Sequence, residues 1–353
     1  MTDLVRARLD AQLLSGRPAS SPDAVAERIL AVQAQDVRGF RLAVRSRSTG
    51  TTVGDLDAAL ADRRLVVGWL NRGTLHLVRV DDYWWLHGLT APRQRVGNQR
   101  RLRNLGLDVP TSARGVDIVV DALTRDGPLT RAALRDRLEP AGVPTEGQAL
   151  VHVLVAASVE GHVVRGPMAG SDQLFVAAEQ WIGPAPASPD PDVALARLAR
   201  RYLAGHGPAA PADLAGWAGL PLGDARRAFA AVAGETEVGA DGLVALPGAR
   251  APAPLPLPRL LGPFDPLLHG WTSRDFVVGA HRGVVTVNGI FRPVALVDGR
   301  VVATWRMPGG VVTLDPLEAV APRALDALAA DAEAVLAYLG LPVRPLVVSD
   351  RRG

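Results

Sequence analysis

The sequence predicts an α+β protein in which three tandem winged-helix units precede a small antiparallel β-barrel-like domain and a C-terminal helix. The main observation is an order of three helical segments and a β-hairpin, which recurs along the chain and is typical of winged-helix proteins. Two proline-rich stretches, Pro184–Pro191 and Pro252–Pro258, separate successive blocks. We therefore expect the chain to divide into the segments 1–110, 111–186, 187–252 and 253–353.

The first unit contains three helical segments and a hairpin. Its second helix begins with the capping sequence Ser20–Asp23, and we expect it to reach Gln33–Asp36 because apolar residues recur at spacings of three and four. Asn71–Gly73 joins two apolar runs as a hairpin turn. The remaining helices and strands of this unit are expected at 4–15, 53–62, 65–70 and 74–78.

The same order is predicted twice more. Gly127–Pro128 and Gly207–Pro208 each stand just before the second helix of a unit. Helices are expected at 116–123, 131–138, 148–159, 193–203, 211–217 and 222–232. The hairpins of these units are expected to pair 162–165 with 174–176, and 236–238 with 243–246.

The C-terminal segment shows short apolar runs separated by turn residues, which is typical of a small antiparallel barrel or curled sheet. Asp298–Gly299 is a hairpin-turn dipeptide. Strands are expected at 276–280, 283–287, 292–297 and 300–306, and a closing helix at 325–339.

Composition excludes several classes of chemistry. The chain has no cysteine and no lysine, so all 39 of its basic Lys/Arg positions are arginine. Disulfides, cysteine-ligated zinc and a thiol nucleophile are therefore excluded, and only the α-amino group could form a Schiff base. The histidines show no metal-binding spacing, and no phosphate-binding glycine loop is present, so we expect neither a metal nor a cofactor. Without a long apolar run or a signal-peptide pattern, we expect a cytoplasmic protein with no membrane contact.

Three local features are candidates for function. The first is Gln33-Ala34-Gln35-Asp36, at the expected end of the second helix. On a continuous helix Gln33 and Gln35 would point about 200° apart, so both can face one site only if the helix ends between them. The alternative is an ordinary solvated helix terminus. Asp36 could stabilise a positive charge, or it could cap the segment that follows, which we favour.

The second candidate is the hairpin. Alternation places Thr74 and His76 on one face, and Arg72 at the turn could reach a phosphate or a groove, so we expect all three residues to contact DNA. An ordinary half-buried hairpin with one histidine on its wetter face is the alternative.

The third candidate is a basic run without an acidic residue, which directly follows the first hairpin. A phosphate-contacting strip is slightly favoured over a solvated helix face, although the net charge of the chain is only +3. The run comprises Arg93, Arg95, Arg100, Arg101 and Arg103.

Taken together, these features resemble the winged-helix DNA glycosylases of the AlkZ-like and YcaQ-like kind, which excise alkylated bases and unhook interstrand crosslinks. The resemblance covers nearly the whole chain. The sequence departs from it at one position: Gly68 stands just before the hairpin tryptophan, where such proteins often carry arginine. The resembling segments are Val32–Asp36, Leu65–Val78, Ala212–Leu220, Phe264–Leu268 and Val297–Arg306.

The resemblance implies that Gln33 and Gln35 are catalytic, as in the Gln-x-Gln branch of the family. It implies a monofunctional enzyme that hydrolyses the glycosidic bond of alkylated or crosslinked purines in double-stranded DNA and leaves an abasic site. We expect a nucleoid-associated monomer. The alternative is a non-enzymatic winged-helix regulator or DNA-structure binder. The expected third helix of the first unit, 53–62, carries mainly Asp and Ala. These side chains are poorly suited to hydrogen-bond base edges, which speaks against sequence-specific DNA recognition by this helix. The lesion, and whether its base is flipped, stay open.

Overall fold

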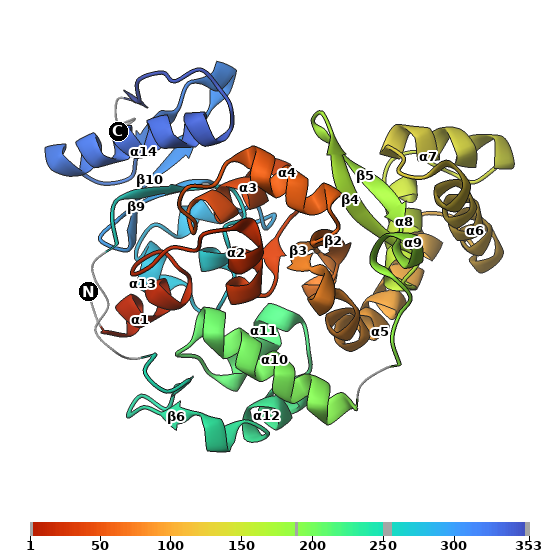
Figure 1. Ribbon diagram of the computed structural model, residues 1–353, viewed down its shortest axis with the longest axis horizontal. Coiled ribbons are helices and arrows are strands. Elements are labelled where there is room, and N and C mark those ends of the chain that lie inside the picture. Colours follow the sequence, from red (N-terminus) through yellow and green to blue (C-terminus); the bar gives the residue numbers. More distant parts are fainter. Residues whose placement is uncertain (1–2, 188–189, 250–255, 350–353) are drawn as a thin grey trace. The chain divides into compact units, whose positions relative to one another are not determined.

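The computed structural model describes residues 3–187, 190–249 and 256–349, so parts of both proline-rich stretches and the boundary expected at residue 252 lie outside them. The chain forms two compact units (Figure 1). We call residues 1–56 and 195–353 the N/C unit, and residues 57–194 the central unit. Both combine helices with sheets, which confirms the α+β class. The winged-helix organisation and the fourfold division stay predictions.

The N/C unit begins with α1 (Asp3–Ala11), α2 (Pro22–Ile29), β1 (Val32–Gln33) and α3 (Val37–Arg45). Helix α2 starts as predicted, because the Ser21 hydroxyl accepts the Ala24 amide at 3.1 Å and Pro22 occupies the first turn. Its predicted end is wrong. Leu30 has a φ of 66°, which turns the backbone out of the helix before Gln33 is reached. Gln33 therefore lies in a strand, and α3 was not predicted.

Helix α4 (Val53–Ala61) spans the boundary between the units. The next part of the N/C unit matches the predicted helix–helix–helix–hairpin order. A buried Asp213 stabilises the start of α11 by accepting the Ala210 amide at 3.0 Å. The elements are α10 (Pro191–His206), α11 (Pro211–Ala218), α12 (Leu222–Ala230), β6 (Glu237–Val238) and β7 (Val244–Ala245).

The C-terminal sheet is open, so the predicted barrel is wrong. Its strand order is β12-β11-β10-β9-β8, and among the described residues no pairing joins the two edge strands. Asp298 and Gly299 both have positive φ, which confirms the predicted hairpin turn. The strands are β8 (Arg259–Leu261), β9 (Val294–Val297), β10 (Arg300–Arg306), β11 (Thr313–Pro316) and β12 (Val347–Val348).

Two predicted strands of this region are helical turns instead. They are the short helix α13 (Asp275–Val278) and the 3-10 helix η5 (Arg282–Val284). The valines of both turns are buried, so the apolar runs correctly indicated core residues. Such short runs do not show whether the backbone is a strand or a helical turn. Helix α14 (Pro322–Tyr338) confirms the closing helix. Its Leu328 and Leu336 form a core with Trp305 of the sheet.

The central unit contains a sheet in which two hairpins are joined. Strand β2 pairs with β3 as predicted, with Val67 opposite Leu77, and also with β4 at Arg165. The hairpins expected in separate units therefore share one sheet, which local sequence patterns do not reveal. The elements are β2 (Leu65–Trp69), β3 (Leu75–Arg79), α5 (Val80–Asn104), α6 (Val109–Asp126), α7 (Arg131–Leu138), α8 (Ala149–Val159), β4 (Val163–Ala169), β5 (Asp172–Ala177) and α9 (Ala178–Ile182).

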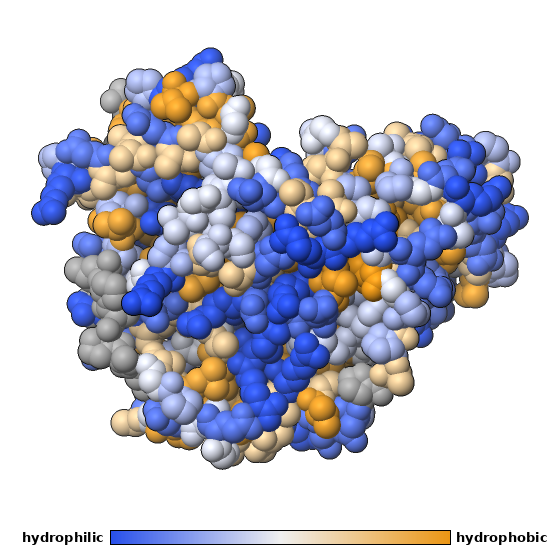
Figure 2. All heavy atoms as spheres, viewed as in Figure 1, coloured by the Kyte–Doolittle hydropathy of each residue, from blue (hydrophilic) through white to orange (hydrophobic). Residues whose placement is uncertain are grey.

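On the face shown in Figure 2, hydrophobic side chains form small separate groups between hydrophilic ones. Within the described ranges, every helix is too short or too polar to cross a membrane.

Candidate active site and nucleic-acid interface

The two glutamines of the Gln33-Ala34-Gln35 motif lie on non-helical backbone. Gln33 ends β1, and Gln35 is the last residue before Asp36, whose own φ and ψ are extended at −121° and 126°. Helix α2 ends at Ile29, so the two side chains are not held about 200° apart by a continuous helix. The side chain of Gln33 is buried, with 5% exposed, while Gln35 is exposed. One glutamine of the motif therefore lies in the interior and the other at the surface.

Asp36 caps α3. Its Oδ1 accepts the Gly39 amide at 2.6 Å, and its carbonyl accepts the Phe40 amide at 3.1 Å. This fixes the start of the helix directly after Gln35. The carbonyl of Pro263 lies against the same turn, because a Cβ atom built on Gly39 would be 2.5 Å from that oxygen. Only glycine fits there without a shift of the backbone.

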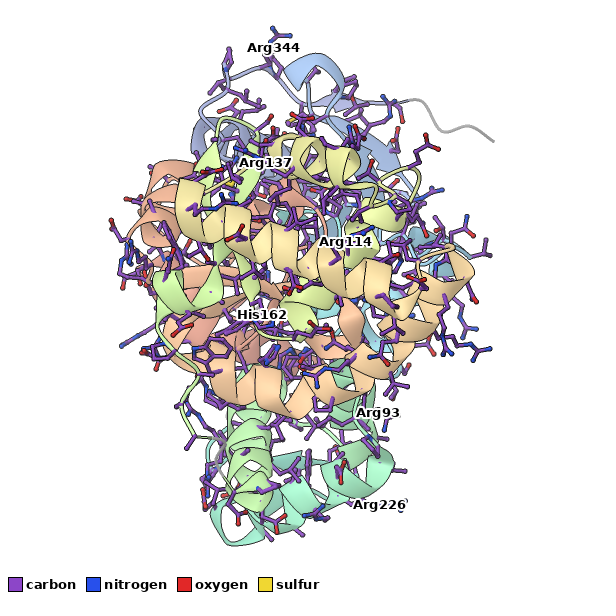
Figure 3. The ribbon with its side chains drawn as sticks, turned by 90° about the vertical axis from the view of Figure 1, so that its right-hand side faces the viewer. Arg93, Arg114, Arg137, His162, Arg226 and Arg344 are labelled. Carbon is purple, nitrogen blue, oxygen red and sulfur yellow. The ribbon has the colours of Figure 1, made fainter. Side chains whose placement is uncertain are left out.

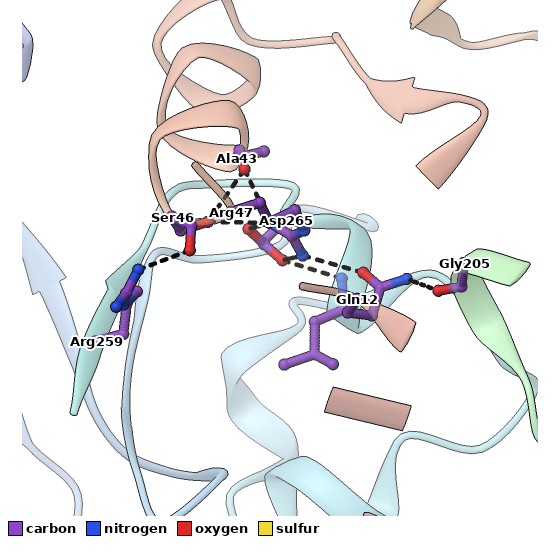
Figure 4. A network of polar contacts seen from close by, with 8 residues as sticks. Gln12, Ala43, Ser46, Arg47, Gly205, Arg259 and Asp265 are labelled. Atoms are coloured by element: carbon purple, nitrogen blue, oxygen red, sulfur yellow. Dashed lines mark hydrogen bonds and ion pairs between the residues drawn. The ribbon is translucent and has the colours of Figure 1, made fainter. Parts of the chain in front are cut away.

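A buried ion pair anchors the far end of α3 (Figure 4). Arg47 binds both carboxylate oxygens of Asp265, at 2.7 and 2.9 Å, and both side chains are fully buried. Arg47 also donates to Gln12 at 3.0 Å, and Gln12 donates to the Gly205 carbonyl at 2.6 Å. The sequence singled out the segment Phe264–Leu268 but not these partners, since they lie far away along the chain. The network fixes the helix that follows the glutamine motif.

The hairpin of the central unit exposes only part of its predicted surface. Arg72 is exposed, with a left-handed φ of 56°. Thr74 is half-buried, and its hydroxyl donates to the Asn71 carbonyl at 3.0 Å. His76 is 1% exposed, so it lies on no wet face. The alternative, a half-buried hairpin with His76 on its wetter face, is wrong because β3 is covered on both sides from Leu75 to Val78.

His76 is held neutral. Burial, assisted by the positive charge of Arg72, lowers its pKa to about 3. The Nδ1 atom lies 3.0 Å from the Thr74 carbonyl, which can only accept, so Nδ1 carries the proton. His76 therefore supports the hairpin from inside.

This burial predicts a loss of stability in acid. The unfolded chain binds a proton at His76 near pH 6.5, whereas the folded chain binds one only near pH 3. The stability that comes from keeping His76 neutral is therefore fully present above pH 6.5, and it is lost as the pH falls from 6.5 towards 3. At pH 5 the loss is expected to be about 2 kcal/mol. Urea unfolding at pH 7.5 and pH 5 should show a smaller difference for His76→Gln than for the unchanged protein. Equal differences would contradict this assignment.

The departure at Gly68 has a packing reason. A Cβ atom there would lie 2.6 Å from Cε2 of Tyr83, which is fully buried. An arginine at this position would displace that ring. The missing arginine thus reflects how α5 packs on β2 in this chain.

The arginine run lies on the C-terminal half of α5, and all five side chains are exposed. At 100° per residue, Arg93, Arg100 and Arg103 fall within a sector of about 80°. Arg95 and Arg101 lie outside it. They donate to the Val159 carbonyl at 3.4 Å and to Gln148 at 2.5 Å. The run is therefore a three-residue basic face with two flanking arginines bound to the end regions of α8. Figure 3 shows Arg93 on α5.

Gln94 brings the Arg72 turn and the basic helix together, because its Nε2 donates to the Leu70 carbonyl. The Arg72 turn and α5 are thus in direct contact within the central unit. Gln33, Gln35 and Asp36 belong to the N/C unit.

Comparison with known proteins identifies the family. The model of the family described as DNA glycosylase AlkZ-like matches residues 26–338. An interstrand DNA cross-link repair glycosylase of Streptomyces sahachiroi is 29% identical over 362 residues, which cover 96% of each chain. The solved structure of the Streptomyces sahachiroi DNA glycosylase AlkZ has the same fold, with a TM-score of 0.81 at 24% identity and 98% coverage of each chain. This chain belongs to the AlkZ-like DNA glycosylase family.

Proposed function

We propose that this protein is a monofunctional DNA glycosylase that hydrolyses the N-glycosidic bond of N7-alkylguanine-type or crosslinked purines in duplex DNA. Family membership supports the reaction class, and the relative's description supports a crosslinked substrate. The observation that carries the proposal is the Gln33-Ala34-Gln35 motif on non-helical backbone, directly before a capped and anchored helix.

The chemistry suits glutamines. A purine alkylated on a ring nitrogen is cationic and leaves readily, so the reaction needs little help from an acid. The transition state resembles an oxocarbenium ion, and the remaining task is to hold a water at the anomeric carbon. A glutamine amide both accepts and donates hydrogen bonds but does not act as a base. We assign Gln33 and Gln35 to placing this water, so positioning supplies the acceleration.

The product should be an intact abasic strand. The chain has no lysine, so no side-chain amine can form the Schiff base that strand cleavage requires. DNA binding is assigned to the exposed face of Arg93, Arg100 and Arg103 together with Arg72, which would contact phosphates. We propose that the enzyme acts as a monomer.

The test is unhooking of a duplex that carries one interstrand crosslink between N7-linked guanines. On a denaturing gel, the protein should convert the crosslinked species to single strands of full length. Alkali should then cleave the strand that lost its base. Persistence of the crosslinked species, with a folded protein that binds the duplex, would contradict the crosslink assignment. Strand breaks without alkali would contradict the monofunctional assignment.

A further inference from the structure

A half-exposed aromatic cluster lies in the N/C unit. Phe264, His269 and Phe291 are each partly accessible. The ring of His269 stacks on Phe264 at 6.3 Å and 11°, and its centroid lies 3.8 Å from that of Phe291. The guanidinium of Arg274 covers Phe291 at 5.3 Å. Accessible rings beside an arginine are a combination that proteins use to stack nucleobases and hold their phosphates.

Phe264 has an unfavourable backbone conformation for its type. Its φ is 56°, in the left-handed region that favours glycine. Neighbouring contacts impose this conformation: the Phe264 amide donates to the Phe291 carbonyl at 3.2 Å, and the next residue is the buried Asp265. The chain thus keeps a bulky ring where glycine would be least strained, and such outliers cluster at functional sites.

The segment that carries Phe264 packs against α3, the helix that follows the glutamine motif. The Pro263 carbonyl contacts the first turn of α3 at Gly39, and that turn is capped by Asp36, the residue after Gln35. Gly262 adds a second contact, since a Cβ atom there would be 2.9 Å from Cβ of Leu42. The Arg47–Asp265 ion pair fixes the other side of Phe264. Both neighbours of Phe264 are thus tied to the helix that begins at the motif.

We propose that Phe264 is the stacking platform for the adducted base, so that Gln33 and Gln35 meet its glycosidic bond. Arg274 would pair with a phosphate of the same nucleotide. This assignment rests on the proposed function, because it places the adducted nucleotide at the glutamine motif. It makes Phe264 a residue that distinguishes DNA with a base at the lesion from DNA without one.

The experiment compares binding to two duplexes by fluorescence anisotropy. One contains 7-methylguanine on a 2′-fluorinated sugar that resists hydrolysis, and the other has a tetrahydrofuran abasic analogue at the same position. The unchanged protein should bind the adduct more tightly, by roughly fivefold to a hundredfold. Phe264→Leu keeps the strained backbone but lacks the ring and should lose this preference. Phe264→Trp should retain it.

A matched control is Phe276→Leu, which removes another half-exposed ring of the same unit. Phe276 contacts Trp271 and Arg8 rather than the segment against α3, so its loss should leave the preference unchanged. If Phe264→Leu does not fold, Phe264→Gly provides the same test with a residue that suits the left-handed backbone. A preference that survives loss of the Phe264 ring, or that is equally lost in Phe276→Leu, would overturn the proposal. Binding is measured without excision, so this failure is distinct from a failure to excise.

Discussion

Replacing Gln33 or Gln35 with alanine is expected to reduce the single-turnover rate of base excision by about 10²- to 10³-fold, the loss typical when one preorganised hydrogen-bonding group is removed from an active site. Each alanine would remove the amide that positions the attacking water. Gln35 is exposed, so Gln35→Ala should leave the unfolding midpoint unchanged. Gln33 is buried, and Gln33→Ala is expected to cost some stability as well.

The control for this prediction is Gln180→Ala, which removes an exposed glutamine of the central unit. It should excise at the unchanged rate. DNA binding by both motif variants should stay within a few-fold, because the phosphate contacts are assigned to arginines. If Gln35→Ala excised at the unchanged rate while remaining folded, water positioning by this residue would be wrong.

The largest effect on stability is expected from Asp265→Ala. Asp265 and Arg47 are both 0% exposed, and removing one partner of a buried pair costs about 3–5 kcal/mol because it leaves the other charge uncompensated. The change also removes the acceptor for the Leu267 amide, at 2.9 Å. Urea unfolding should show the loss as a lower midpoint. The double variant Arg47→Met/Asp265→Leu should be less destabilised than either single change.

The exposed pair Arg125–Asp121 provides the matched control, since its side chains are 69% and 63% exposed. Asp121→Ala should shift stability by about 0.5 kcal/mol or less. Equal effects of Asp265→Ala and Asp121→Ala would show that the buried pair does not anchor α3.

Local sequence signals predicted the elements whose ends carry turn or capping residues. Ser21–Pro22 marked the start of α2, and Asp298–Gly299 marked the β9–β10 turn. The end of α2 was not predictable from the sequence, because the apolar residues Val25, Ile29 and Val32 keep a helical spacing. The helix nevertheless ends at Ile29, since Leu30 has a positive φ. The glutamine motif was found, but its place beyond the end of α2 was not predicted.

Features that depend on long-range packing were not predictable. Arg47 and Asp265 are 218 positions apart, so no local pattern links them. Alternation in the β3 sequence indicated a wet face for His76, whereas both faces of that strand are covered. The arginines lie exposed on a helix, but the division of the run into a basic face and two arginines bound near α8 depends on how two helices pack.

The most direct test of the proposed function uses a duplex with a single 7-methylguanine. After incubation with the unchanged protein, Gln33→Ala or Gln35→Ala, the DNA is heated in alkali and the strands are separated. We predict alkali-dependent cleavage at the lesion with the unchanged protein, an intact strand before alkali, and little cleavage with either variant. Absence of cleavage with a folded protein that binds this duplex, or equal cleavage by all three proteins, would contradict a glutamine-dependent N7-alkylguanine glycosylase.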